Sequence, residues 1–470
     1  MTRAAADIGT GAAADRHAAA RERLRQQYVA IPAGAPVRLA KRTSNLFRPR
    51  TRSTVPGLDV SSFRSVLSVH PAARLADVQG MTTYEDLVAA TLPYGLMPTV
   101  VPQLKTITLG GAVTGLGIES TSFRNGLPHE AVRELELLTG AGEVVVATAD
   151  GPHADLFRTF PNSYGTLGYA LRLLIELEPV HPYVHLRHLR FPDVGRLTET
   201  LGTVLADRAY DGEPVDFLDG TVFDADEAYL TLGGWADTAP STSDYTGQRI
   251  YYRSIQSRRE DFLTVHDYLW RWDTDWFWCS RAFGAQNPRI RRLWPKRWLR
   301  SDVYWKLIHL EDRFQVAARI DRRRGLPPRE RVVQDVEIPL GRTADFLSWF
   351  LREVPIRPFW LCPVRLRAGA GPAGGAPWPL YPLRPGEDYV NVGFWSTVPV
   401  EPSARDGDAN RRVEDAVDAH GGHKSLYSDA YYEADRFWSL YGGDAYRDVK
   451  RRYDPDGRLL DLYAKAVKRR

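Results

Sequence analysis

The sequence predicts an α+β protein with two domains. At 470 residues, the chain exceeds the roughly 250 to 300 residues at which a single hydrophobic core stops growing. Residues 37–180 mix short strand patterns with one clear helix, and the chain from residue 185 onward mixes longer strand patterns with helices. Such a mixture is typical of a sheet that carries its helices on one face.

The bulk composition excludes several classes of protein. A formal net charge of +4 is too small to predict nucleic-acid binding. Cys279 and Cys362 are far apart, so we expect no disulfide framework and no zinc ribbon, and a reducing cytoplasm is the simplest location. Without a long apolar stretch or an apolar signal region, we expect neither a membrane span nor a signal peptide. Residues 1–27 are expected to form a disordered or weakly helical tail.

The first half of the chain contains one predicted helix among strands. The helix covers 82–95, with Thr82 as its cap and Glu85 three residues later. Alternation or β-branched runs predict strands at 73–80, 143–148 and 165–180.

The second half repeats strand and helix patterns around one expected sheet. Helices are predicted at 193–208 and 342–353. Strands are predicted near 184–191, 227–233, 332–339 and 389–396. Residues 367–379, rich in Gly, Pro and Ala, are expected to form a surface loop. The tail from 431 to 467 is expected to be helical, amphipathic and basic.

The segment 104–126, LKTITLGGAVTGLGIESTSFRNG, has five glycines and a single carboxylate, Glu119. Clustered glycine weakens a core unless another group approaches the backbone closely, and that group is commonly a phosphate. A Rossmann fingerprint is a poor match, because we expect strands and turns here and no helix for a pyrophosphate. We favour a phosphate cradle carried by the sheet, supported by further glycines at 165 and 168. The alternative is a glycine-rich turn without a ligand.

Three segments in this half, 84–126, 132–148 and 155–177, resemble in order and spacing the FAD-binding domain of the vanillyl-alcohol oxidase and p-cresol methylhydroxylase (PCMH) type. The resemblance covers residues 37–180. It implies an α+β architecture in which a two-lobed PCMH-type FAD-binding domain is covered by an α+β cap, or substrate, domain. We therefore expect an FAD-binding domain at 28–182 and a cap domain at 183–425, with 426–470 packing back near the flavin.

The same resemblance implies a set of FAD-binding residues. The pyrophosphate and ribityl chain would be lined by Thr108, Gly110, Gly111, Gly115, Gly117, Ile118, Glu119, Ser120 and Ser122. The adenine and the flavin would be bordered by Gly126, Gly165, Thr166 and Gly168. Family members with covalent flavin commonly carry a histidine in an earlier loop, which here is LAKRTSNLF and has none. We expect non-covalent FAD, with a diphosphate held by Lys41, Arg42, Thr43, Ser44 and Asn45; the alternative is a basic loop without a ligand.

The resemblance continues through 331–340, 356–366, 423–443 and the terminal 446–466, which look like the sterol Δ24-reductase (diminuto) branch. That branch reduces an isolated carbon–carbon double bond in a lipid tail. It is similar to bacterial flavoproteins that reduce a methylene-branched fatty acyl chain to a methyl-branched one, which the resemblance implies here, with NADPH or NADH as electron donor. The alternatives are a sterol reductase, a flavin-dependent alcohol oxidase or dehydrogenase, and a lipid-binding protein that retains a flavin fold without turnover.

Reduction of an unactivated alkene needs an acid that stays protonated at neutral pH. In VVQDVEIP, a period of two places Asp335 and Glu337 on one face of a strand, opposite Gln334. The alternative is a sheet whose second face meets solvent. The candidate catalytic residues are Asp335, Glu119, Tyr427, Gln334 and Trp360. We expect Cys362 to be a core thiol.

Residues 270–300 hold six of the thirteen tryptophans, and the second part of this segment has cations but no acid. This composition predicts peripheral contact with anionic lipid, on the inner face of the plasma membrane. The alternative is the core of the cap domain with a solvated basic helix. On a strand, the side chains of His181 and His185 would share one face while that of His188 points away, so we expect no metal centre. The sequence leaves the oligomeric state open.

Overall fold

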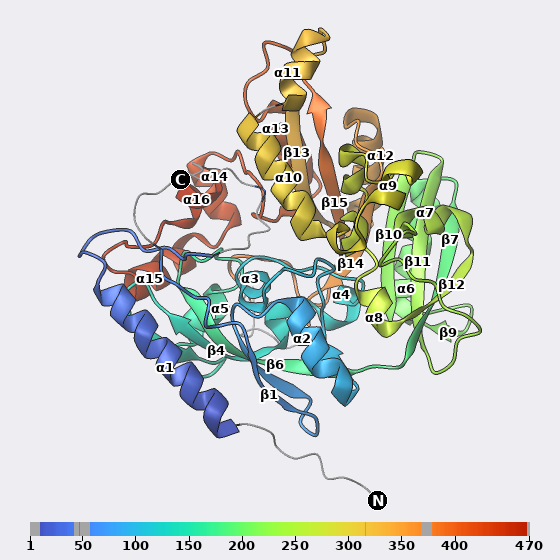
Figure 1. Ribbon diagram of the computed structural model, residues 1–470. Coiled ribbons are helices and arrows are strands. Elements are labelled where there is room, and N and C mark those ends of the chain that lie inside the picture. Colours follow the sequence, from blue (N-terminus) through green and yellow to red (C-terminus); the bar gives the residue numbers. More distant parts are fainter. Residues whose placement is uncertain (1–9, 42–46, 48–56, 315, 368–377, 468–470) are drawn as a thin grey trace, which may run out of the picture.

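The computed structural model describes residues 10–41, 47, 57–314, 316–367 and 378–467. Two large antiparallel sheets, one in each half of the chain, organise the fold (Figure 1). The expected α+β class is confirmed, because helices accompany both sheets.

The first sheet has six strands in the order β1-β2-β6-β4-β5, with β3 paired to the far end of β6. Its strands are β1 (Val66–His70), β2 (Leu75–Gln79), β3 (Leu96–Pro98), β4 (Val132–Leu138), β5 (Val144–Ala147) and β6 (Tyr169–Pro179). Helices α2 (Tyr84–Thr91) and α5 (Ala154–Thr159) belong to the same domain. The capping residue of α2 is Thr83 and not Thr82, because Thr83 Oγ1 accepts the Asp86 amide while Thr82 is fully buried.

The N-terminal segment differs from its expectation as a frayed tail. Residues Thr10–Val29 form helix α1, which packs along the first sheet and buries Leu24 and Tyr28 (Figure 1). His17 lies between the Glu136 carboxylate and the Gln79 amide, at 2.9 and 3.0 Å. Alanine occurs on both the buried and the exposed side of the helix, and a histidine occupies one buried position, so the sequence pattern does not reveal its docking.

The second sheet has eight strands in the order β12-β7-β11-β10-β14-β15-β13-β16. The strands are β7 (Tyr183–Phe191), β10 (Phe217–Asp224), β11 (Glu227–Ala236), β12 (Glu260–Thr264), β13 (Arg329–Pro339), β14 (Phe359–Arg365), β15 (Asp388–Pro399) and β16 (His423–Lys424). Strands β8 (Ala209–Tyr210) and β9 (Glu213–Pro214) form a separate ribbon. One face packs on α6 (Val194–Asp207), α12 (Leu340–Glu353) and α13 (Asp408–Ala419). The opposite face packs into the core shared with the first domain.

A set of short helices connects β11 to β13. They are α7 (Tyr251–Ser257), α8 (Val265–Leu269), η3 (Asp273–Asp275), η4 (Cys279–Phe283), α9 (Pro288–Leu293), η5 (Lys296–Trp298), α10 (Ser301–Phe314) and α11 (Val316–Arg323). The tryptophans at 270, 272, 276 and 278 are all buried, so the first part of the expected membrane segment is core. Arg291 is also buried, with its guanidinium on the Asp275 carboxylate at 2.6 and 2.9 Å. Among the described residues, no helix has the length and apolarity to cross a membrane.

The C-terminal segment returns to the first domain through α14 (Ala434–Leu440), α15 (Gly443–Tyr453) and α16 (Leu462–Ala466) (Figure 1). Lys450 Nζ donates to the Thr166 carbonyl at 2.7 Å, and Lys465 Nζ donates to the Tyr164 carbonyl at 2.5 Å. The chain end therefore fixes the turn that precedes β6.

Candidate active site

The glycine-rich segment of the first domain contains a short helix that we did not expect. Thr108 caps α3 (Leu109–Thr114) by accepting the Gly111 amide, and Lys41 Nζ donates to Thr108 Oγ1 at 3.0 Å. A side chain at Gly111 would place its Cβ 2.8 Å from Thr108 Oγ1 and 3.4 Å from Lys41 Nζ. Bare backbone beside an ammonium group suits a phosphate, so these residues fit an FAD pyrophosphate.

Other glycines of the expected cradle are explained by protein packing. A Cβ at Gly110 would lie 2.7 Å from the Gly80 carbonyl, and one at Gly117 would lie within 2.9 Å of the Pro102 and Pro128 rings. Gly168, with φ at +143°, passes close to the Leu138 carbonyl. Some glycines of the cluster are therefore required by close packing within the protein, and only part of the cluster fits a ligand.

The remaining expected FAD-binding residues have internal partners or conformational roles. Ser120 Oγ donates to Glu119 Oε1, Ser122 Oγ accepts the Glu119 amide, and Thr166 Oγ1 donates to the Ser163 carbonyl. Gly126 and Gly165 both have positive φ, Gly115 ends α3, and Ile118 is buried. Arg42, Thr43, Ser44 and Asn45 lie outside the described residues.

Two rows of side chains cross the cap sheet on the face that meets the first domain. In register across four strands, the first row contains His423, Glu337, Asn391 and Cys362. The second row contains Asp335, Gly393 and Trp360. Directly opposite residues in antiparallel strands share a face. Apart from the half-buried Asp335, the residues of both rows are buried, so the alternative of a second face that meets solvent is wrong.

Asp335 is held at the centre of this face. Asn391 Nδ2 lies 3.3 Å from Asp335 Oδ1, and the Tyr427 hydroxyl hydrogen-bonds the same carboxyl. Trp395 Nε1 donates to the Tyr427 hydroxyl at 2.8 Å. Burial raises the pKa of Asp335 to about 7, against the lowering effect of both hydrogen bonds. A side chain at Gly393 would overlap the carboxyl, which explains the glycine in the middle of β15.

Next to Asp335, Nε2 of His423 and Oδ1 of Asn391 are buried polar atoms without a hydrogen-bond partner within the described part of the chain. Beside them, the Glu337 carboxyl and the Tyr381 hydroxyl interact with each other. Burial raises the pKa of Glu337 well above its usual range, which favours its neutral form, and lowers the pKa of His423 to about 3, so this imidazole is neutral near pH 7. Unsatisfied buried polar atoms are rare in folded proteins, so their clustering here fits a polar ring system or substrate bound against this face.

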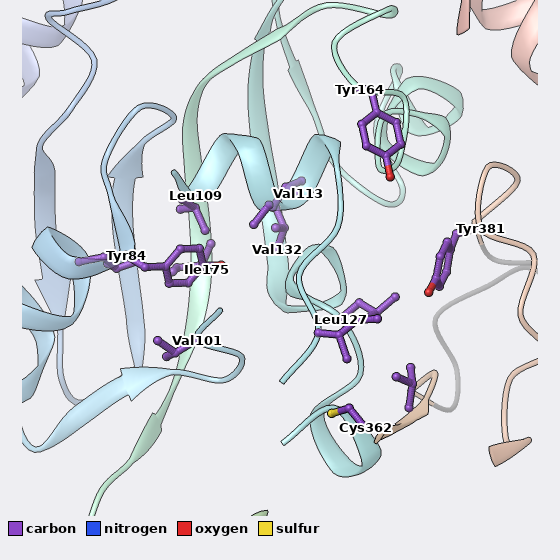
Figure 2. Packing of buried hydrophobic residues seen from close by; sticks show 14 of the residues in the cluster. Tyr84, Val101, Leu109, Val113, Leu127, Val132, Tyr164, Ile175, Cys362 and Tyr381 are labelled. Atoms are coloured by element: carbon purple, nitrogen blue, oxygen red, sulfur yellow. The ribbon is translucent and has the colours of Figure 1, made fainter. Parts of the chain in front are cut away.

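Figure 2 shows part of the buried core to which both halves of the chain contribute. Tyr164 and Tyr381 lie on the same side of α3, and Cys362 lies below Leu127 in this view. The Tyr164 hydroxyl accepts the Leu426 amide at 3.0 Å, which ties the C-terminal segment to the first domain. Cys362 is fully buried and its thiol pKa is raised well above the usual value, so it is a neutral thiol.

A second acidic cluster joins the two domains. The fully buried Arg271 donates to Glu119 at 3.3 Å and to Asp219 at 3.0 Å, and it stacks on the Tyr268 ring. Burial raises the pKa of Glu119 to about 7 despite the neighbouring guanidinium. Trp360 Nε1 lies 3.4 Å from Asp219 and so connects this cluster to the second row. Glu119 therefore bridges two domains, and it is less suited than Asp335 to deliver a proton.

The structure separates the remaining candidates. Gln334 lies on the helix-covered face, where its amide donates to Asn410 at 2.7 Å, so the structure does not bring it to Asp335. Trp360 and Tyr427 do lie near Asp335. Sequence reasoning missed His423 and Asn391, which only the register of the sheet reveals, and Tyr381, which lies between β14 and β15. It also missed Arg271, although an arginine among apolar and aromatic residues is itself a signal of a buried ion pair.

Comparison of the sequence with known proteins relates the chain to FAD-dependent enzymes. Residues 28–148 match the FAD binding domain family. The chain is 26% identical to the Delta(24)-sterol reductase of Arabidopsis thaliana over 445 residues, covering 88% of this chain and 77% of the relative. Identity to the human Delta(24)-sterol reductase is 26% over 434 residues, covering 87% and 76%. A shorter stretch of 123 residues, 26% of each chain, is 35% identical to decaprenylphosphoryl-beta-D-ribose oxidase of Mycolicibacterium smegmatis.

Proposed function

We propose that this FAD-dependent oxidoreductase reduces an unactivated carbon–carbon double bond in a lipid chain. The substrate we favour is a methylene-branched fatty acyl chain on a phospholipid, which becomes methyl-branched, with NADPH or NADH as the electron donor. The observation that carries the proposal is Asp335, a half-buried carboxyl whose pKa of about 7 keeps a proton available on a sheet face that also carries Glu337 and Trp360. The proposal includes peripheral contact with a membrane from the cytoplasmic side.

The chemistry requires a proton and a hydride. An isolated alkene accepts hydride poorly until its less substituted carbon is protonated, which leaves positive charge on the tertiary carbon. FAD, when bound and reduced, supplies the hydride. The protein must therefore hold a proton at a fixed atom, exclude water and tolerate a transient positive charge.

The described residues meet these requirements. Asp335 holds the proton at a carboxyl oxygen that Tyr427 and Asn391 orient. Near Asp335, the Phe277 ring packs on the Trp360 ring, with the centroids 5.5 Å apart, and on the Trp395 ring, with the centroids 4.6 Å apart. Aromatic faces attract positive charge, and their burial keeps water from competing for it.

Sterol Δ24-reduction is the second candidate. The specific observation in its favour is that the relatives named for it align with most of the chain. It needs the same acid and the same hydride, so it shares every residue role proposed for the acyl substrate. A flavin alcohol oxidase would instead need an ionised base near the flavin, whereas Asp335 and Glu337 favour their neutral forms.

The proposal is tested by product analysis. Purified protein is incubated anaerobically with NADPH and phospholipids that carry a 10-methylene acyl chain, with a Δ24-sterol in a parallel reaction. We expect the methyl-branched acyl product by mass spectrometry. A saturated sterol side chain alone would assign the second candidate, and the absence of either product would contradict lipid alkene reduction.

Reoxidation of the reduced flavin by alkene should depend on pH. Because the pKa of Asp335 is raised to about 7, its acid form is present below that pH and is lost above it. The rate constant is expected to be flat in acid and to fall about tenfold per pH unit above the pKa. Stopped-flow reoxidation between pH 5.5 and 9 checks this, and a rate that rises with pH would contradict it.

The same shift affects folding stability with a defined sign. Because the raised pKa of Asp335 favours the protonated folded protein, Asp335 stabilises the fold fully below its pKa in the unfolded chain, about 4. This contribution to the free energy of unfolding is lost as pH rises through about 7.

FAD is expected to be bound tightly but without a covalent bond, because the loop at 39–47 has no histidine. Acid precipitation should release the yellow colour into the supernatant. Colour that stays in the pellet after washing would show covalent attachment.

A further inference from the structure

An exposed apolar surface lies on the short helices of the cap domain. It is formed by α9, η5 and α10, and we call it the α9–α10 surface. The exposed fraction is 86% for Leu293, 53% for Leu310, 49% for Trp298 and 43% for Ile290. Large apolar side chains gathered in this way on a folded protein mark an interaction site, because their exposure to water is unfavourable and a partner that covers them lowers the free energy.

The same helices form an open cavity of about 670 Å³ at the surface. It is lined by Ile290, Leu293, Trp294, Pro295, Trp298, Val303, Lys306 and Leu307. The volume falls within the range of about 300 to 1,000 Å³ that is typical of ligand pockets. Lys306 is the single charged residue in this lining, so the cavity suits an apolar ligand whose polar end stays near the rim.

Unpaired positive charge surrounds the cavity. Arg289, Arg292, Lys296 and Arg297 are exposed, and none has an ion-pair partner within the part of the chain that the structure describes. No acidic residue occurs between Arg281 and Arg300. Cations beside exposed tryptophan are typical of surfaces that contact anionic headgroups. A second copy of the chain would bring like charges together, which disfavours self-association through this surface.

We propose that the α9–α10 surface docks on a bilayer containing anionic phospholipid and that the cavity takes one acyl chain of such a lipid. This inference rests on the proposed function, because it supplies the route by which a lipid reaches the enzyme. The cations contact the headgroups, while Leu293, Trp298 and Leu310 enter the interface.

Aromatic contacts connect this surface to the candidate active site. Trp305, on α10, packs on Trp276 at 5.3 Å and on Phe47 at 4.4 Å. Phe47 lies 5.9 Å from the Tyr427 ring, and Tyr427 hydrogen-bonds Asp335. These ring contacts connect the α9–α10 surface to Asp335 through Trp305, Phe47 and Tyr427.

Sedimentation with vesicles tests the docking. The FAD-loaded protein is mixed with phosphatidylcholine vesicles, with and without phosphatidylglycerol. We expect binding to the anionic vesicles that weakens as salt rises. Arg289→Gln, Arg292→Gln and Arg297→Gln together should weaken it about a hundredfold, and Leu293→Asp should weaken it at least about tenfold.

Matched variants elsewhere control for charge and apolarity. Arg196→Gln, Arg342→Gln and Arg352→Gln remove three exposed cations from α6 and α12, and Val29→Asp changes an exposed apolar residue of α1. Both controls should sediment as the wild type does. Equal losses in test and control variants, or no binding of the wild-type protein, would overturn the docking surface.

Fluorescence quenching tests the cavity. Phosphatidylglycerol with brominated acyl chains should quench the tryptophan emission, and Trp294→Phe with Trp298→Phe should remove most of that quenching. Unchanged quenching in the double variant would place the acyl chain elsewhere. Neither readout requires turnover, and reduction of detergent-dispersed lipid by the wild-type protein is measured separately. Failure of docking and failure of the proposed reaction therefore give different results.

Discussion

Replacing Asp335 with asparagine is expected to slow alkene-driven reoxidation of the flavin by a factor of about 10² to 10⁴, the usual effect of removing a general acid. Asparagine has nearly the same shape as aspartate and can keep the contacts to Tyr427 and Asn391. It cannot supply the proton. FAD content and the rate of flavin reduction by NADPH should therefore stay near their wild-type values.

Two other acids, Glu119 and Glu337, are less suitable for the first test. Glu119 already shares Arg271 with Asp219 between the two domains, so Glu119→Gln is expected to affect folding as well as turnover. Glu337 lies in the neighbouring row and burial raises its pKa as well, which makes it the next acid to test. Asp345→Asn, on the exposed side of α12, is the matched control. If the flavin of Asp335→Asn is reoxidised by alkene at the wild-type rate, Asp335 is not the acid, and Glu337→Gln is the next variant to measure.

Gly111→Val is expected to abolish FAD binding while the protein stays folded. The added side chain would meet Thr108 Oγ1 and Lys41 Nζ, which are ends of side chains that can move, and so it would occupy the proposed phosphate position. Purified Gly111→Val should lack the flavin absorbance but keep the far-ultraviolet circular dichroism of the wild type.

Two further variants show whether this loss is specific. Gly117→Val would meet the Pro102 and Pro128 rings, so its flavin loss should accompany reduced thermal stability. At Gly341, on exposed α12, an added Cβ meets no described atom within 4 Å, and Gly341→Val should retain flavin. Normal flavin content in Gly111→Val would contradict the cradle at α3.

Much of the fold can be predicted from the sequence where side chains have a clear period. The alternation in 332–339 correctly places Asp335 and Glu337 on one face and Gln334 on the other. The helix at 193–208 has a regular apolar stripe and an Asp193 cap, and it forms as α6 within one residue at each end. These elements are set by local pattern and capping, which a sequence shows directly.

Other features depend on partners that are distant in the chain. The contact between Arg271 and Glu119 joins residues 152 positions apart, and no local pattern predicts it. Composition alone also included Trp270 to Trp278 in the segment expected to contact a membrane, although these residues are buried, because they lie in turns and short 3₁₀ helices that have no period to separate core from surface. The exposed large apolar side chains of that segment, Ile290, Leu293 and Trp298, occur from α9 onward.

A single anaerobic turnover tests the central claim most directly. The protein is reduced with one equivalent of NADPH, oxygen is excluded, and a phospholipid with a methylene-branched acyl chain is added while flavin absorbance is followed. The account predicts that oxidised flavin returns as the lipid gains two hydrogens, in equal amounts and faster in the wild type than in Asp335→Asn. Flavin that stays reduced until oxygen is admitted, with the lipid unchanged, would contradict it.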